Sequence, residues 1–186
     1  MKYLVSITLM AMLAGSATAD QKAAHVEQSR EAVKQFFGKL KGELQAGMKA
    51  GGPVNAIEVC SEKAPDIARQ VSEKNDLKIG RTSLKPRNSD NAPDEWEKSV
   101  LREFEQRKAD GENPGKMEKH AIVEQDGQQH FRYMKAIPTG ELCLKCHGSE
   151  LDPGVSAKLE KLYPEDRATG YSEGDLRGAF TIIKDL

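Results

Sequence analysis

The most informative stretch of the sequence is Cys143-Leu144-Lys145-Cys146-His147, two cysteines separated by two residues and followed directly by a histidine. This spacing is typical of the attachment site of a c-type haem. The two thiols can add across the two vinyl groups of one porphyrin, because two intervening residues let a single turn present both sulfurs to the same edge. The histidine would then lie under the iron and bind it through an imidazole nitrogen. The pattern therefore predicts one covalent haem c held by Cys143, Cys146 and His147.

The same two cysteines could instead belong to a zinc site or to a redox dithiol. A structural zinc site needs four closely placed Cys or His ligands, usually in two paired motifs. This chain has three cysteines and no second CxxC pair. A thioredoxin-like dithiol usually lies at a helix N-terminus within a βαβ pattern, which the surrounding sequence does not show. The motif therefore favours haem attachment over both alternatives.

The start of the chain predicts export. Met1-Lys2 gives a short positive start, Leu4 to Ala14 is almost wholly apolar, and Ala17-Thr18-Ala19 has the small-x-small pattern that signal peptidase cuts. The apolar run is shorter than the about 20 residues that cross a bilayer as a helix. We therefore expect residues 1–19 to be a signal peptide, cleaved before Asp20, and the mature protein to be periplasmic. In bacteria, haem is joined to cysteine thiols outside the cytoplasm.

The composition predicts a single domain that binds no nucleic acid. Residues 20–186 are short enough to fold around one core. The chain has 28 Lys and Arg residues against 29 Asp and Glu, for a net charge of −1. It therefore lacks the basic surplus that would attract nucleic acid or an anionic membrane. We also expect no membrane span after the signal peptide.

The first part of the mature chain is predicted to form two helices. Apolar residues recur at helical spacing from Gln21 to Lys49. Gly51-Gly52-Pro53 breaks this helix, and Pro53 suits the first turn of the next one. One stripe of the second helix is predicted to carry Ile57, Cys60, Ala64, Ile67 and Val71.

The rest of the chain is predicted to contain short strands and helices. In order, we expect a strand at Leu77–Leu84, a loop at Arg87–Pro93, a helix capped by Asp94, strands at Lys119–Gln125 and Gln128–Ile137, a helix at Val155–Tyr163 and a strand at Gly178–Lys184. Asp126-Gly127 is a strong signal for a hairpin turn between the two middle strands. Helices packed against a small antiparallel sheet make an α+β domain.

A haem iron has room for a second axial ligand, and several residues compete for that position. Cys60 is the leftover thiol of a chain that we expect to be exported. It lies on the apolar stripe of its helix, where a ligand for a buried haem would have to be, although a free cysteine is often simply a small buried hydrophobe. The competing ligands are the thioethers of Met48, Met117 and Met134 and the imidazoles of His25, His120 and His130. The residue types and their spacing leave this choice open.

Several motifs follow one another along nearly the whole mature chain. They are Ala56–Ser61 with Ala64-Pro65, Arg81–Asn88, Asn91–Pro93 with Trp96-Glu97, Cys143–Gly148, and Gly170-Tyr171 with Gly174–Ala179. In this order they resemble a family of exported, PAS-like c-type haem proteins that was long classed only as a domain of unknown function. The resemblance implies a PAS-like fold, with the iron ligated by His147 and by the thiolate of Cys60. Family members occur as free-standing proteins and as input domains of membrane signalling proteins.

Three further residues are candidates for contact with the cofactor. Arg81 and Arg87 could pair with the haem propionates, because a guanidinium binds a carboxylate in a bidentate way. Ordinary solvation at the surface would explain either arginine equally well. Tyr133, on the strand that precedes the haem motif, could face the macrocycle or pack in the core.

The expected ligand pair suggests a function. A thiolate donates electron density and stabilises ferric iron, which predicts a low reduction potential. On reduction the bond from iron to Cys60 weakens, and its loss would open a site for CO or NO. We therefore expect a redox or gas sensor that acts on a redox partner protein or a membrane signalling protein, with a small electron-transfer cytochrome as the alternative. We do not expect an enzyme, because two protein ligands leave no open position on the iron.

Overall fold

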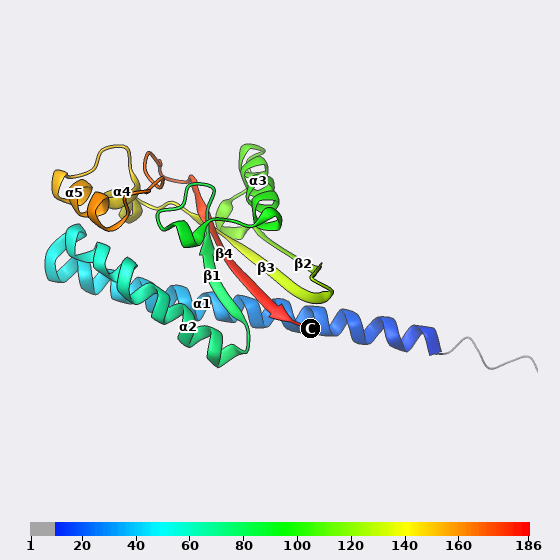
Figure 1. Cartoon of the computed structure of the whole chain (residues 1–186). Helices are drawn as coiled ribbons and strands as arrows, with labels where there is room; N and C mark the ends of the chain where they lie inside the picture. Colours follow the sequence, from blue (N-terminus) through cyan, green and yellow to red (C-terminus); the bar gives the residue numbers. More distant parts are fainter. Residues whose placement is uncertain (1–9) are drawn as a thin grey trace, which may run out of the picture.

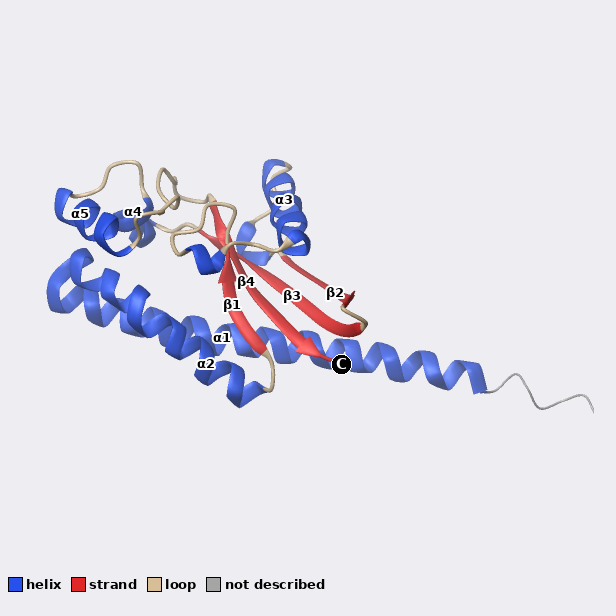
Figure 2. Ribbon diagram, viewed as in Figure 1, coloured by secondary structure: helices blue, strands red, loops and turns tan. Residues whose placement is uncertain are grey.

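A four-stranded antiparallel sheet with helices on both faces forms the body of the protein (Figures 1 and 2). The computed structural model describes the backbone from residue 10 and the side chains from residue 19 to residue 186. Residues 1–9 of the predicted signal peptide therefore lie outside the described residues. The predicted α+β class is confirmed.

The first helix, α1, spans Met10–Glu58 and turns back on itself near its end. Gly51 and Gly52 leave the helical conformation there, and Gly52 has a φ of 70°, which glycine adopts without steric penalty. The helix resumes at Pro53, whose missing amide is tolerated in a first turn. The predicted break at these residues is confirmed, and the chain runs back alongside the first part of α1 (Figure 1).

A widened turn interrupts the returning helix. Val59–Lys63 forms a turn of π-helix, η1, before α2 begins at Ala64 and continues to Asn75. The amide of Ala64 donates to the carbonyl of Val59, five residues earlier. The next residue, Pro65, has no amide to donate to the carbonyl four residues before it, and its ring crowds that carbonyl. Single π-turns are frequent at functional sites, and Cys60 lies in this one.

The strands lie in the order β1-β4-β3-β2, and each neighbouring pair is antiparallel. Their bounds are Lys78–Thr82 for β1, Glu118–Gln125 for β2, Gln128–Pro138 for β3 and Leu176–Asp185 for β4. Asp126 and Gly127 join β2 to β3 with φ of 53° and 78°, as the predicted hairpin turn requires. The strand expected at Leu77–Leu84 is shorter, because the Ser83 side chain accepts the amide of Lys85 and turns the chain away from the sheet.

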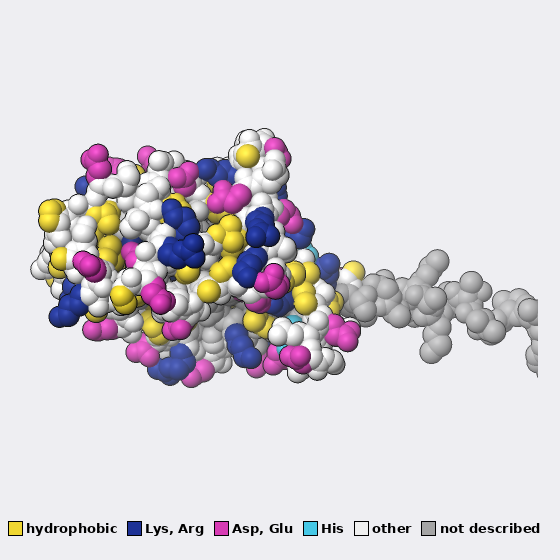
Figure 3. All heavy atoms as spheres, turned by 45° about the horizontal axis from the view of Figure 1, so that its top comes forward, with side chains coloured by type: hydrophobic (Ala, Val, Ile, Leu, Met, Phe, Trp, Pro, Cys, Tyr) yellow, Lys and Arg dark blue, Asp and Glu magenta, His cyan; other side chains and the backbone are white. Residues whose placement is uncertain are grey.

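Two cores form on the two faces of the sheet. On one face Phe131, Tyr133 and Phe180 pack against α1 and α2, where the Phe36 and Phe180 rings meet edge to face. On the other face Met117 and Met134 pack against α3, which spans Glu95–Ala109. Asp94 caps α3 as predicted, in a reciprocal capping box with Glu97. Charged side chains of both signs are interspersed on the face of the molecule that Figure 3 shows.

Two short helices lie beyond the end of the sheet. They are α4, Glu141–His147, and α5, Pro153–Leu162. Both lie over the turn at the end of α1, far from the hairpin tip between β2 and β3 (Figure 1). A third, smaller core joins α5 to the returning part of α1 through Ile57, Val155 and Leu159. This corner brings α4 and α5 together with the part of α1 that leads into the π-turn.

Candidate haem site

The haem motif forms the helix α4. Cys143 and Cys146 lie three residues apart on it, and residues at this spacing share one face of a helix. Both thiols are free and partly exposed. The helix ends at Gly148, where an added Cβ would lie 2.7 Å from the carbonyl oxygen of Leu144. Glycine at this position therefore lets the chain turn away directly after His147.

The His147 ring is held in one tautomer. Its Nδ1 lies 2.7 Å from the carbonyl oxygen of Ala168, which can only accept a hydrogen bond. Nδ1 therefore carries the proton, and Nε2 keeps a free lone pair. Burial, with the charges of Arg177 and Arg87, lowers the pKa of His147 to about 2. A neutral imidazole whose second nitrogen is bound to a carbonyl is the usual form of a metal-ligating histidine.

Cys60 lies next to the motif, as the predicted ligand pair requires. Ile57, one turn before Cys60, packs in the small core against which Cys146 also lies. Burial raises the pKa of Cys146, and the negative charge of a Cys60 thiolate raises it further. The same thiolate charge acts on Tyr163, which follows α5 and lies against this core. Residues far apart in the sequence therefore bring the third thiol beside the other two.

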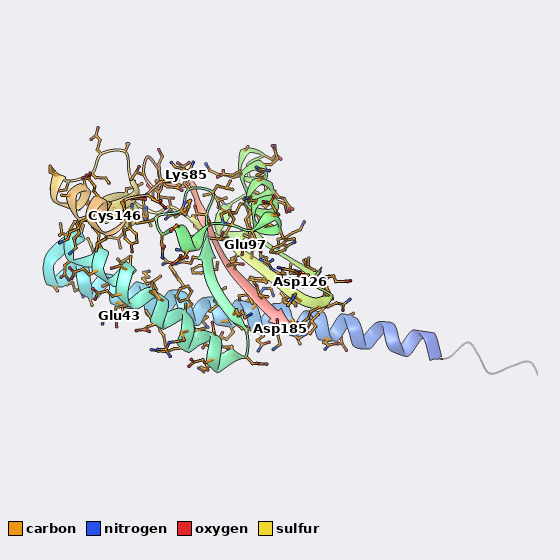
Figure 4. The ribbon with its side chains drawn as sticks, in the orientation of Figure 1. Glu43, Lys85, Glu97, Asp126, Cys146 and Asp185 are labelled. Atoms are coloured by element: carbon orange, nitrogen blue, oxygen red, sulfur yellow. The ribbon has the colours of Figure 1, made fainter. Side chains whose placement is uncertain are left out.

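Most of the competing axial ligands lie elsewhere. Met117 and Met134 are buried under α3, on the sheet face opposite α1 and α2. His130 binds Asp185 at 2.8 Å, at the opposite end of the molecule from Cys146 (Figure 4). His25 and His120 lie beside the neighbouring Phe131 ring, at centroid distances of 5.3 and 6.0 Å. Met48 is the remaining competitor, because it lies on α1 shortly before the turn that α4 and α5 cover.

Three arginines from separate segments surround the motif. We call Arg81 of β1, Arg87 of the following loop and Arg177 of β4 the arginine cluster, because each acts on the pKa of His147. Arg87 donates to the carbonyls of Cys146 and Ala168 and pairs with Asp166 at 3.0 Å. Arg87 thus holds the protein's own haem motif. Whether it also binds a propionate stays a prediction.

The other two members of the cluster pair with no carboxylate among the described residues. The Arg81 guanidinium lies 5.9 Å from the centre of the Phe36 ring. Arg177 lies 5.4 Å from the centre of the Tyr171 ring, and its buried Nε has no hydrogen-bond partner. Burial lowers the pKa of both arginines, because it disfavours their charged form. Two such cations suit a ligand with two carboxylates, and a haem carries two propionates.

Tyr133 does not lie at this site. Its side chain is fully buried between the sheet and α1, and its hydroxyl donates to Glu118 at 2.8 Å. Burial raises the pKa of Tyr133, and its hydrogen bond to Glu118 adds to the rise. The strand alternates its side chains between two faces, and Tyr133 points to the face that α1 covers. This placement agrees with the second of its two alternatives, core packing, and a contact with the cofactor stays a prediction.

Both the sequence and the fold of the chain are similar to known proteins. Residues 11–184 match the family described as Tll0287-like. The chain belongs to this Tll0287-like family. The "Crystal structure of the cyanobacterial heme-protein Tll0287" matches with a TM-score of 0.66 and 20% sequence identity, over 88% of this chain and 96% of that one. At this identity the likeness shows the fold. No curated protein sequence matches the chain.

Sequence reasoning missed several residues of the Tll0287-like site. Asp166, Ala168 and Tyr171 all lie on the loop between α5 and β4, and Arg177 begins the extended segment after it. Ala168 acts through its backbone carbonyl, so its side chain gives no signal in the sequence. Tyr171 and Arg177 occur in the motifs that resemble the family, but the motifs alone assign them no role.

The described residues contain neither a membrane-spanning helix nor a cluster of metal ligands. No helix in residues 10–186 has both the length and the apolarity to span a bilayer. Nor do three or more His, Cys, Asp or Glu side chains in that range gather as ligands for a metal ion. A cavity of about 610 Å³ lies between α1 and α2, lined by Lys39, Glu43, Glu62, Lys63, Asp66, Ile67 and Gln70. It has no lining residue in common with the haem motif.

Proposed function

We propose that this protein carries one haem c, attached through Cys143 and Cys146 and ligated by His147 and Cys60. The main support is the His147 ring, because its bond to Ala168 leaves Nε2 as the only free nitrogen. Tll0287, a solved protein with the same fold, is a cyanobacterial heme-protein. A haem bound here would supply reversible one-electron chemistry and an iron centre for small ligands.

The chain's own residues would set the state of this centre. Ala168 fixes the ring plane and tautomer of His147, while Tyr171 meets the same ring edge to face at 6.2 Å. Burial lowers the pKa of Arg81, and the charge of a Cys60 thiolate acts against this effect.

We further propose that the centre acts as a redox or gas sensor in the periplasm. Because a thiolate favours ferric iron, Cys60 would hold the iron in the oxidised protein and would be released on reduction. The position of Cys60 supports this step, because it is partly exposed on a π-turn rather than fixed in a regular helix. Its release would open the iron to CO or NO, and a redox partner or membrane signalling protein would read the change.

The first experiment determines the attachment and the ligand together. The chain is expressed with its own N-terminal segment in a bacterium that attaches haem c, and its mass and ferric EPR spectrum are recorded for the parent, Cys60→Ala and Met48→Leu. We expect one covalent haem in all three and a low-spin thiolate signal that only Cys60→Ala loses. A haem removed by acid–acetone, or a zinc-loaded apo mass, would overturn the proposal. A parent spectrum without the thiolate signal, which changes in Met48→Leu but not in Cys60→Ala, would assign the ligand to Met48.

A further inference from the structure

The start of β4 is built to hold Arg177 at one position. Gly178 has a φ of 150°, and a Cβ added there would lie 2.3 Å from the carbonyl oxygen of Thr82. Only glycine therefore lets the start of β4 approach the end of β1 so closely. This approach places Arg177 beside Ser83, the residue that follows Thr82.

Ser83 and Arg177 bind each other in both directions. The Ser83 hydroxyl donates to the Arg177 carbonyl at 2.9 Å, and the Arg177 Nη1 donates to the Ser83 Oγ at 3.1 Å. Ser83 itself is buried. Only the second bond involves the guanidinium, and its Nη1 also donates to the Lys85 carbonyl at 3.5 Å. The buried Nε has no hydrogen-bond partner. The side chain is thus fixed in place while much of its donor capacity stays free.

The buried Tyr171 ring links this arginine to the axial histidine. Arg177 lies 5.4 Å and the Lys85 ammonium 4.6 Å from the ring centroid. His147 meets the same ring edge to face. The free donors of Arg177 are therefore one aromatic ring away from the residue that we propose as iron ligand.

The charges around the motif do not balance. The arginine cluster contains three guanidinium groups, and Asp166 pairs with Arg87 alone. The two groups without a carboxylate, Arg81 and Arg177, are both partly buried. An unpaired cation removed from water is unfavourable, so the cluster is suited to an anionic ligand with two negative charges.

We propose that Arg177 and Arg81 each bind one haem propionate, whereas Arg87 positions the haem motif through the Cys146 carbonyl. This inference rests on the proposed function. It adds Arg177, to which the sequence analysis assigns no role. It also distinguishes the two arginines that bind the cofactor from Arg87, which binds the protein. Ser83 is then a positioning residue that acts through Arg177.

The test compares Arg177→Gln and Arg81→Gln with Arg167→Gln, a matched control on the exposed loop that precedes Ala168. Mass spectrometry first establishes covalent haem in each protein. Resonance Raman spectra then report the propionate bending modes, and redox titrations report the potential at several pH values. We expect shifted propionate modes, a lower potential and a new dependence of the potential on pH in both cluster variants. A propionate without its cation favours ferric iron and takes up a proton more readily.

Each outcome leads to a different conclusion. Covalent haem with unchanged Raman modes and potential in Arg177→Gln or Arg81→Gln would overturn the assignment of that arginine. The same shifts in Arg167→Gln would show a general effect of charge and would also overturn it. If Arg177→Gln does not fold, Ser83→Ala is measured instead, and it should shift the modes of one propionate because it frees Arg177; unchanged modes would contradict the proposal. A parent protein without haem would refute the proposed function itself.

Discussion

The carbonyl oxygen of Cys146 accepts a hydrogen bond from the guanidinium of Arg87, which lies 59 positions earlier in the chain. The same guanidinium binds Asp166 and the carbonyl of Ala168. Ala168 in turn accepts the Nδ1 proton of His147. One side chain therefore ties together the loop before α3, the haem motif and the segment that orients its histidine.

Arg87→Gln should destabilise the protein by about 3 kcal/mol, because it leaves the buried Asp166 carboxylate without its cation. Urea denaturation at neutral pH measures the change in the free energy of unfolding. Arg87→Gln/Asp166→Asn removes both charges and should restore part of the loss. A single variant as stable as the parent would show that the pair does not hold the motif.

The proposed switch predicts that reduction makes the iron accessible. Ferrous protein should bind CO, whereas ferric protein should keep Cys60 and stay six-coordinate. Cys60→Ala should bind CO after reduction without the delay that release of Cys60 imposes. Absorbance spectroscopy after stopped-flow mixing measures both reactions. A reduced parent protein that stays six-coordinate and ignores CO would instead support an electron carrier, which keeps both ligands in both oxidation states.

Pro65→Ala tests whether the π-turn places Cys60. The new amide can donate to the carbonyl of Ser61, so the helix can continue with regular α-helical bonds. We expect unchanged or increased thermal stability together with a weakened ferric thiolate signal, because the turn that presents Cys60 is rewound. Pro53→Ala is the control, since Pro53 lies in a first turn where a missing amide is tolerated. A full thiolate signal in Pro65→Ala would mean that the π-turn is not required.

Gly178→Ala should be strongly destabilising, by roughly 2 kcal/mol or more, because its φ of 150° and the nearby Thr82 carbonyl both exclude a Cβ. Gly80→Ala in β1 is a matched control, where the nearest atom to the new Cβ would be 3.8 Å away, on Thr181. That control should change stability little. Thermal melts of the two variants measure the difference, and equal melting temperatures would contradict the packing at the start of β4.

Two histidines at the far end of the sheet should make stability depend on pH. Burial lowers the pKa of His25 and of His120, with smaller contributions from Lys184 and Lys22 respectively. The unfolded chain therefore binds more protons than the folded one once the pH falls below about 6.5. Stability should decline from that pH downward, until the lowered folded-state pKa values are passed.

His25→Gln/His120→Gln should flatten this decline between pH 7 and pH 5. Melting temperatures of parent and variant across that range measure the effect, and identical slopes would exclude these two side chains. The Glu118 carboxyl affects stability in a separate, more acidic pH range. Its pKa is lowered mainly by its hydrogen bond to Arg30. Its contribution to the stability of the folded protein is therefore present above its ordinary pKa of about 4.5 and is lost at lower pH.

Local signals in the sequence were enough to predict where several elements begin, turn or end. The glycines before Pro53, the Asp126-Gly127 turn and the Asp94 cap act through their own backbone or nearest neighbours, and all three lie where they were predicted. The π-turn was not predicted. The apolar stripe that includes Cys60 has the spacing of an ordinary α-helix. It therefore predicts no π-turn, although Pro65, which lacks the amide for a regular helical bond, is visible in the sequence.

Local sequence patterns predicted only part of the candidate site. The spacing of the haem motif predicts covalent haem attachment without any knowledge of the fold. The carbonyl of Ala168 and the place of Arg177 depend on where a distant loop and strand return, which no local pattern encodes. The two alternatives for Tyr133 stayed open in the sequence, because its nearness to the motif says nothing about which face of β3 it occupies.

The place of β4 in the sheet differs from its place in the chain. This strand is synthesised after β1, β2 and β3, yet it lies between β1 and β3 in the sheet. Until it is present, the helical hairpin with Cys60 and β1 has no strand to join it to the β2–β3 hairpin that leads to His147. If the proposed haem is attached through the cysteines of α4, its ligation by Cys60 would require these two parts of the chain to have come together. The sixth iron bond would then serve as a spectroscopic marker of folding.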